Sequence, residues 1–242
     1  MTQQSTTAQT PKESSVETSS IEATEDVMAA VKVPLTRVRK AVAKAMTFSA
    51  TVPQFAVERA IQTQAMFDLR KDLPTTISVG DLINAAIVRA LVEHPRLNAS
   101  WHDDHIIEFG HVNLGVAVAV LDGLVVPAIT TAEKLSLTEL SNRRRELTTA
   151  AQEGKLHPRD LGTATISVSN LGTTGITGIL PMVIPPQAAI IGLPGRMSDG
   201  TMIITAACDH RVVDGLPAAQ FLNSLAQAIE DRRRESKAKS AQ

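Results

Sequence analysis

The segment Asp209-His210-Arg211-Val212-Val213-Asp214-Gly215 places four ionisable side chains between an apolar stretch and an amphipathic one. Charges that are half-buried in such a place are costly unless they are paired. A histidine at the end of a strand is held rigidly enough to act as a general base, with Asp209 or Arg211 controlling its surroundings. The same residues are also compatible with a salt-bridged turn that does no chemistry. A His-x-x-x-Asp metal pair is a weaker interpretation, because the sequence suggests no third ligand.

Other residues that often carry chemistry favour plain structural roles. The glycines at 172, 175 and 178 match neither a dinucleotide fingerprint nor a P-loop, so we expect tight turns there. The single cysteine, Cys208, is predicted to be a small buried strand residue, because no second histidine is suggested to activate its thiol. The run Arg143-Arg144-Arg145 is predicted to be a solvated helix face rather than an anion site. The sequence has no His-x-x-x-His or Cys-x-x-Cys pair, so no metal site is predicted.

Helices and strands must position the segment at 209–215. Apolar spacing and capping residues predict helices that start after Thr36, Ser78 and Ser136, the last two with capping boxes, and a final helix from Leu216 to about Arg234. Runs of apolar and β-branched residues predict strands at 54–61, 106–109, 112–121, 124–129, 163–169, 188–193 and 202–207, with a hairpin turn at Asp122-Gly123. These elements predict an α/β sandwich with a mixed sheet and flanking helices.

Composition excludes several classes of protein. There are 24 Lys and Arg against 25 Asp and Glu, so the broad basic field that nucleic acids or anionic membranes require is missing. The longest apolar stretches are far shorter than the ~20 residues that span a bilayer. One cysteine indicates a reducing compartment, and we expect a cytoplasmic protein. Residues 1–30 are rich in Ser, Thr and Glu and are predicted to be a disordered tail, as are the polar residues 235–242.

Several short motifs accompany the segment at 209–215 in a fixed order. They are TRVRK at 36–40, TVP at 51–53, PRLNA at 95–99, HVNLGVA at 111–117, DGLVVP at 122–127, ISVSNLG at 166–172 and PPQAAIIG at 185–192. Each motif alone is weak, but their order is specific. Together they resemble the dihydrolipoamide acyltransferases, the core components of 2-oxo acid dehydrogenase complexes, and their chloramphenicol acetyltransferase-like relatives. The resemblance runs from about residue 33 to 231.

This resemblance implies residues 31–234 to be an acyltransferase catalytic domain that works as a homotrimer with active sites between subunits. It implies transfer of an acyl group between dihydrolipoyl and coenzyme A thiols, without an acyl-enzyme. His210 would be the general base that removes the thiol proton. Ser169 would donate a hydrogen bond to the tetrahedral oxyanion. Asp214 would be an orienting residue, paired to Arg37 or Arg39.

The resemblance also implies partners. The chain shows no lipoyl or subunit-binding domain, so we expect a separate lipoyl-bearing protein and the other subunits of a 2-oxo acid dehydrogenase complex to be its partners. Residues 231–242 are charged and polar, which predicts trimers that do not assemble further. Two alternatives remain open. One is a stand-alone acyltransferase on a small-molecule acceptor, and the other is a scaffold whose own chemistry has lapsed.

Overall fold

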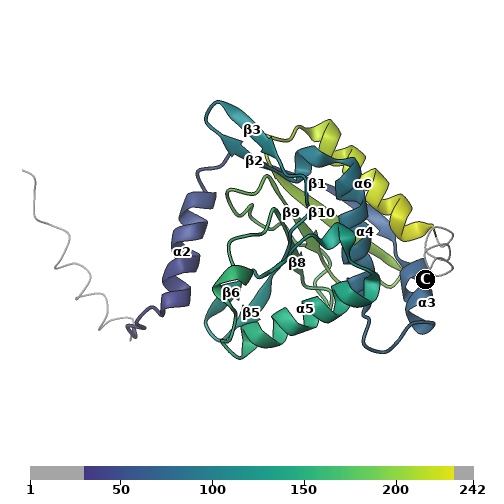
Figure 1. Cartoon of the computed structure of the whole chain (residues 1–242), viewed down its shortest axis with the longest axis horizontal. Helices are drawn as coiled ribbons and strands as arrows, with labels where there is room; N and C mark the ends of the chain where they lie inside the picture. Colours follow the sequence, from purple (N-terminus) through teal and green to yellow (C-terminus); the bar gives the residue numbers. More distant parts are fainter. Residues whose placement is uncertain (1–29, 232–242) are drawn as a thin grey trace, which may run out of the picture. The chain divides into compact units, whose positions relative to one another are not determined.

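The computed structural model describes residues 30–231 (Figure 1). Contacts divide the chain into a unit up to Leu35 and a compact unit from Thr36 onward, and the fold concerns the second unit. Residues 30–35 form neither helix nor strand. The tails predicted at 1–30 and 235–242 lie outside the described residues except for residue 30, as does the end of the final helix predicted at Arg234.

The described chain contains five α-helices and ten strands. The helices are α2 (Arg37–Ser49), α3 (Gln64–Lys71), α4 (Val79–Glu93), α5 (Leu137–Gln152) and α6 (Gly215–Glu230), with short 3-10 turns η1 (Pro95–Leu97), η2 (Ala132–Lys134) and η3 (Pro158–Asp160). The strands are β1 (Gln54–Gln62), β2 (Ala99–His102), β3 (His105–Glu108), β4 (Leu114–Val116), β5 (Val118–Val120), β6 (Gly123–Val125), β7 (Ala128–Ile129), β8 (Ile166–Asn170), β9 (Ala189–Leu193) and β10 (Thr201–Asp209).

The main sheet has six strands in the order β1-β10-β9-β8-β4-β7. The pairs β9/β8 and β8/β4 are parallel, and the other pairs are antiparallel, so the predicted mixed sheet is confirmed. Two hairpins, β2/β3 and β5/β6, form separate small sheets. The long strand β10 pairs with β1 over all nine of its residues, from Gln54 opposite Asp209 to Gln62 opposite Thr201.

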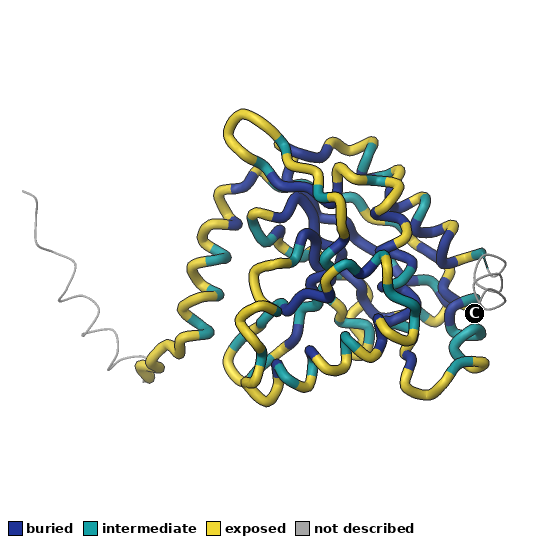
Figure 2. Tube along the Cα trace, in the orientation of Figure 1, coloured by how far each residue is buried: buried dark blue, intermediate teal, exposed yellow. Residues whose placement is uncertain are grey.

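The hydrophobic core lies between the helices and one face of this sheet (Figure 2). Alternate residues of β10, namely Met202, Ile204, Ala206 and Cys208, belong to this core together with buried residues of α4, α5 and α6. Ala207 points to the opposite face, where it belongs to a second, small cluster. The period of two along a strand therefore divides β10 between a helix-covered face and a face covered by the segment before β9.

Local sequence signals placed the starts of α2, α4 and α5 correctly, whereas α3 was not predicted. Ser78 and Asp81 form a capping box at α4, and Ser136 and Glu139 form another at α5. The Thr36 hydroxyl accepts a hydrogen bond from the Arg39 amide at the start of α2. These contacts are short-range, so they are readable from residue types alone.

Two of the predicted strands are wrong as single elements. The run 112–121 is split into β4 and β5, and the run 124–129 into β6 and β7, because these halves pair in different sheets. Both ladders keep one register, with Val118 opposite Val125 and Gly115 opposite Ala128. The interruption lies at Ala117, whose amide donates to the Val168 carbonyl of β8 at 3.0 Å instead of to the hairpin. The turn is also shifted by one residue, because Val120 pairs with Gly123 and leaves Leu121 and Asp122 as the loop.

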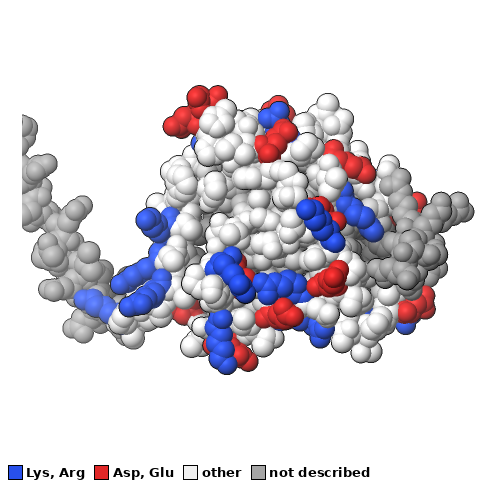
Figure 3. All heavy atoms as spheres, viewed as in Figure 1, with Lys and Arg blue, Asp and Glu red and all other residues white. Residues whose placement is uncertain are grey.

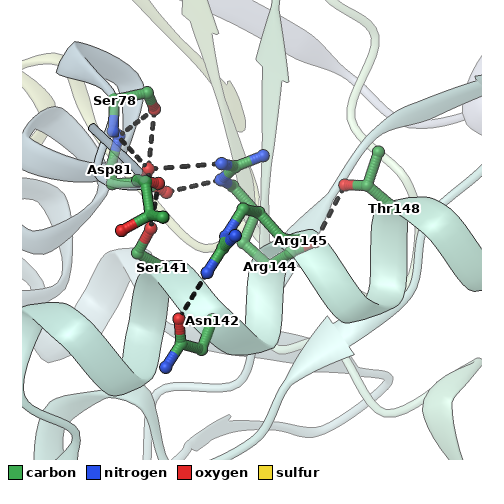
Figure 4. Close-up of polar contacts among 8 residues, drawn as sticks. Ser78, Asp81, Ser141, Asn142, Arg144, Arg145 and Thr148 are labelled. Atoms are coloured by element: carbon green, nitrogen blue, oxygen red, sulfur yellow. Dashed lines mark hydrogen bonds and ion pairs between the residues drawn. The ribbon is translucent and has the colours of Figure 1, made fainter. Parts of the chain in front are cut away.

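The prediction of a solvated face for the three arginines of α5 is wrong for Arg144. Its guanidinium binds both carboxylate oxygens of Asp81, a side chain with no exposed surface (Figure 4). Arg143 binds Asp160, and Arg145 binds Asn142 at the surface. Arg144 lies four residues after Leu140 and three before Leu147, which are both buried, so its spacing placed it on the inner face of the helix.

The surface mixes charges of both signs. On the face shown in Figure 3, acidic and basic side chains lie next to one another. Along residues 30–231, no helix has the length and apolar character that crossing a membrane requires.

We expect Arg144→Ala to lower the free energy of unfolding at pH 7 by about 3–5 kcal/mol, because it leaves the buried Asp81 carboxylate without its cation. Arg145→Ala is the matched control from the same helix and should change stability by less than about 0.5 kcal/mol. Chemical denaturation of both variants measures the difference. Equal losses in the two variants would show that the buried ion pair contributes no more than a surface contact.

The same comparison should depend on pH. Burial by itself raises the pKa of Asp81, but hydrogen bonds from Arg144 and Ser78 outweigh burial and leave the pKa below its usual value. The ionised carboxylate therefore stabilises the fold above the unfolded-state pKa of ~3.9, and this stabilisation is lost as pH falls through the lower folded-state value. The stability difference between the wild type and Arg144→Ala should accordingly shrink in acid.

Candidate active site

The turn after β10 is held by an ion pair between a buried aspartate and a partly exposed arginine. Asp209, the last residue of β10, is 3 % exposed. Its carboxylate accepts hydrogen bonds from the backbone amide of Arg211 at 2.9 Å and from Arg211 Nη2 at 2.7 Å. The Arg211 guanidinium also lies over the Trp101 ring, 5.3 Å from its centroid. Arg211 is thus engaged by Asp209 and Trp101, and the pair fixes the backbone around His210.

The His210 side chain is half exposed, and its backbone is anchored. Its backbone amide donates to the Pro53 carbonyl at 2.8 Å, and its ring lies 4.4 Å from the Phe55 ring. Nδ1 lies 3.4 Å from Asp214 Oδ1, at the edge of hydrogen-bonding distance. A carboxylate at Nδ1 favours the tautomer that carries its proton there, which leaves Nε2 free to accept a proton. This arrangement suits a general base.

Asp214 lies at the turn between β10 and α6. It is the N-terminal capping residue of α6, but its side chain makes no capping hydrogen bond and is 81 % exposed. Within the chain Arg39 lies 3.5 Å from Asp122 of the β5/β6 hairpin, so the pairing of Asp214 with Arg37 or Arg39 stays a prediction. The Asp122 carboxylate also accepts a hydrogen bond from Thr36. Within the chain, Arg39 is therefore paired with Asp122 of the hairpin. Asp214 lies beside His210.

Ser169 lies in another part of the sheet. It occupies the partly buried penultimate position of β8, opposite Gly192 of β9, and Gly192 lies opposite Thr205 of β10. His210 follows Thr205 by five residues, which is about 16 Å along a strand, and two strand spacings add about 9.5 Å across the sheet. One chain therefore holds Ser169 and His210 more than about 15 Å apart. The two predicted catalytic side chains do not meet within a single chain.

The remaining candidates have structural roles. Cys208 is fully buried in the core face of β10. Gly175 has a φ of +77°, as a tight turn requires. Among residues 30–231, no group of three His, Cys, Asp or Glu side chains is placed to hold a metal ion.

A cavity of about 350 Å³ lies away from these residues. It is lined mostly by apolar side chains of α3, α4 and the start of α5, including Leu69, Val88 and Leu137. None of Ser169, His210 and Asp214 borders it. The cavity therefore contributes nothing to the arrangement around His210.

One contact near Ser169 was not predicted from the sequence. The first turn of α4 contacts the next residue of β8, since a Cβ placed on Gly80 would lie 3.1 Å from Asn170 Nδ2. Asn170 Oδ1 in turn accepts a hydrogen bond from the Gly172 amide. The capping box at Ser78 was visible in the sequence, but its contact with β8 was not.

The fold and the site define a class of protein. The structure superposes on chloramphenicol acetyltransferase with a TM-score of 0.51 at 12 % identity, covering 82 % of this chain and 98 % of that one, which shows a shared fold. The model of the 2-oxoacid dehydrogenases acyltransferase (catalytic domain) family matches residues 28–234. The chain belongs to this family, so the expected family and fold class are confirmed.

Two relatives are informative. The chain is 34 % identical over 218 residues to the dihydrolipoyllysine-residue acetyltransferase component of the pyruvate dehydrogenase complex of Rickettsia felis, covering 82 % of this chain and 53 % of that protein. The chain spans about half the length of the curated relatives it matches. The dihydrolipoamide acetyltransferase of Azotobacter vinelandii superposes with a TM-score of 0.79 at 27 % identity, covering 85 % of this chain and 93 % of that one.

For the Azotobacter enzyme, a serine, a histidine and an asparagine four residues after the histidine have been investigated for their roles in catalysis. In this chain Asp214 stands four residues after His210.

Cys208 should be inert to alkylation in the folded protein. Burial, reinforced by the neighbouring charge of Asp209, raises the pKa of its thiol to about 12. Iodoacetamide at pH 8 should therefore leave native protein unlabelled and add one label per chain after unfolding, as read by mass spectrometry. Rapid labelling of the native protein, with loss of activity, would contradict this prediction and make Cys208 a candidate nucleophile.

Proposed function

We propose that the protein is an acyltransferase that moves an acyl group between dihydrolipoyl and coenzyme A thiols as the core component of a 2-oxo acid dehydrogenase complex. Membership of the family supports the reaction class. The observation that carries the proposal is His210, whose backbone is fixed by Pro53 and whose Nδ1 faces Asp214.

The chemistry needs a base and an anion stabiliser. A thiol with a pKa of ~8.5 is mostly protonated at neutral pH, so it is a weak nucleophile until its proton is removed. His210 Nε2 takes this proton as the sulfur attacks the thioester carbonyl carbon. The carbonyl oxygen becomes an oxyanion, to which the Ser169 hydroxyl donates a hydrogen bond. Collapse of this intermediate expels the second thiolate, which recovers the proton from the imidazolium.

Asp214 assists without exchanging a proton. Its carboxylate near Nδ1 keeps the proton on that nitrogen and stabilises the imidazolium that forms during transfer. Asp214 is therefore an orienting group for His210 rather than a base in its own right.

The separation of Ser169 and His210 within one chain supports a site that is shared between two chains. We infer a homotrimer in which each active site combines His210 of one chain with Ser169 of its neighbour. A closed ring of identical chains repeats such a contact at every interface. Dihydrolipoyl and coenzyme A thiols are the two substrates of this site. Residues 232–242 lie outside the described residues, so the expectation that trimers assemble no further stays a prediction.

We expect His210→Ala to lower acyl transfer by about 100-fold or more, because the thiol loses its base. Ser169→Ala should lower kcat by about 100-fold, because the oxyanion loses a donor. The assay follows transfer from acetyl-, succinyl- and isobutyryl-CoA to free dihydrolipoamide. His157→Ala, an exposed histidine of the same chain, is the control and should retain full activity.

The same assay separates the alternatives. Wild-type activity that survives in His210→Ala would indicate background chemistry and a scaffold. Activity that depends on His210 but requires an amine or hydroxyl acceptor would indicate a stand-alone acyltransferase.

A mixing experiment tests whether the site is shared between chains. His210→Ala and Ser169→Ala chains, each inactive alone, are co-expressed at equal levels. In random trimers about a quarter of the sites combine an intact His210 with an intact Ser169 from the neighbour, so about a quarter of wild-type activity should return. No recovery in trimers shown to contain both variants would contradict a site that combines His210 of one chain with Ser169 of its neighbour.

A further inference from the structure

The two capping boxes of this protein have the same pattern but different surroundings. At α5 the Glu139 carboxylate accepts from the Ser136 amide at 2.8 Å and lies at the exposed surface. At α4 the Asp81 carboxylate accepts from the Ser78 amide at 2.8 Å but is completely buried. An exposed carboxylate is sufficient to cap a helix. The burial of Asp81 therefore requires another explanation.

Asp81 joins α4 to α5. Besides its bonds to Ser78, the carboxylate binds the Arg144 guanidinium through both oxygens and accepts from the Ser141 hydroxyl at 3.0 Å (Figure 4). Burying a charge is costly, and a buried pair retains its energy only when its geometry is well satisfied. This cluster, defined here as Ser78, Asp81, Ser141 and Arg144, fixes the first turn of α4 against α5.

That first turn supports the residue that follows Ser169. The Cα of Gly80 lies against the Asn170 side chain, and a Cβ at this position would lie 3.1 Å from Asn170 Nδ2. Asn170 also accepts from the Gly172 amide at 2.8 Å, so its side chain shapes the turn at the end of β8. A displacement of the first turn of α4 would therefore move Asn170, and with it the adjacent Ser169.

We propose that Asp81, held by Arg144, is a positioning residue for the acyl-transfer reaction: it fixes the first turn of α4 so that Gly80 and Asn170 hold Ser169 in place to meet the oxyanion. This inference rests on the proposed role of Ser169. Asp81 touches neither substrate nor reacting atoms in this scheme. Its effect on the rate is exerted only through the position of the Ser169 hydroxyl, where small displacements weaken transition-state stabilisation.

The test uses Asp81→Asn, which keeps the shape and one acceptor oxygen but removes the charge. We expect kcat for transfer from acetyl-CoA to dihydrolipoamide to fall by about tenfold or more, with KM for both substrates nearly unchanged. Glu139→Gln makes the same change in the exposed capping box and should leave kcat unchanged. All assays are run well below the melting temperature of each variant, on trimers purified by gel filtration.

The decisive measurement combines Asp81→Asn with Ser169→Ala. Because Asp81 acts through Ser169, Asp81→Asn should lower kcat in the wild-type background and have no further effect when the serine hydroxyl is absent. Multiplicative losses would overturn the proposal and assign Asp81 a general structural role. If Ser169→Ala alone leaves kcat unchanged, the proposed role of Ser169 fails, and the role of Asp81 fails with it.

A second variant keeps the proposal falsifiable if Asp81→Asn does not fold. Gly80→Ala raises helix propensity in α4 but pushes its Cβ against the Asn170 amide. We expect kcat to fall by several-fold, again only when Ser169 is present, while the melting temperature is not lowered. Gly110→Ala, where a Cβ has open space, is the control. An unchanged kcat in Gly80→Ala would show that the contact with Asn170 does not position Ser169.

Discussion

The register of β10 in the main sheet is the constraint on which the site depends. The strand pairs along its whole length with β1 and places its end, with Asp209, opposite Gln54. Through β9 the same strand aligns Thr205 with Ser169. Backbone hydrogen bonds in a sheet allow shifts only by whole residues, and a shift by one residue would turn the buried side chains outward. His210 and Ser169 are therefore held at a set separation within one chain, which is why the proposed site combines them from two chains.

Each half of the proposed site is supported by a buried aspartate. Asp209 engages Arg211 beside His210, and Asp81 engages Arg144 beside the turn that follows Ser169. In the protein interior such charges are costly unless every partner is in place. An ion pair of this kind tolerates few alternative geometries. Each of these two aspartates is costly to bury, and each fixes the position of the backbone around it.

Much of the architecture was predictable because its signals are local. Capping boxes, apolar helical stripes and β-branched runs depend on residues within one or two turns or strands. The errors arose where partners lie far apart in sequence. The Ala117 amide donates to Val168 of β8, which interrupts a run that reads as one strand, and Asp122 pairs with Arg39 across 83 residues. Arg144 is an intermediate case, since its spacing from Leu140 and Leu147 marked the buried face but did not name its partner.

The sequence by itself determined the family and the mixed α/β fold, and it predicted His210 as the base and Cys208 as a buried strand residue. These depend on residue types in short segments and on their order along the chain. Only the tertiary structure decided that Ser169 and His210 lie far apart in one chain, that Asp214 lies beside His210, and that Asp81 is buried against Arg144. These features depend on strand register and helix packing. The energy of such contacts depends on residues that are far apart in sequence and meet only in the folded chain.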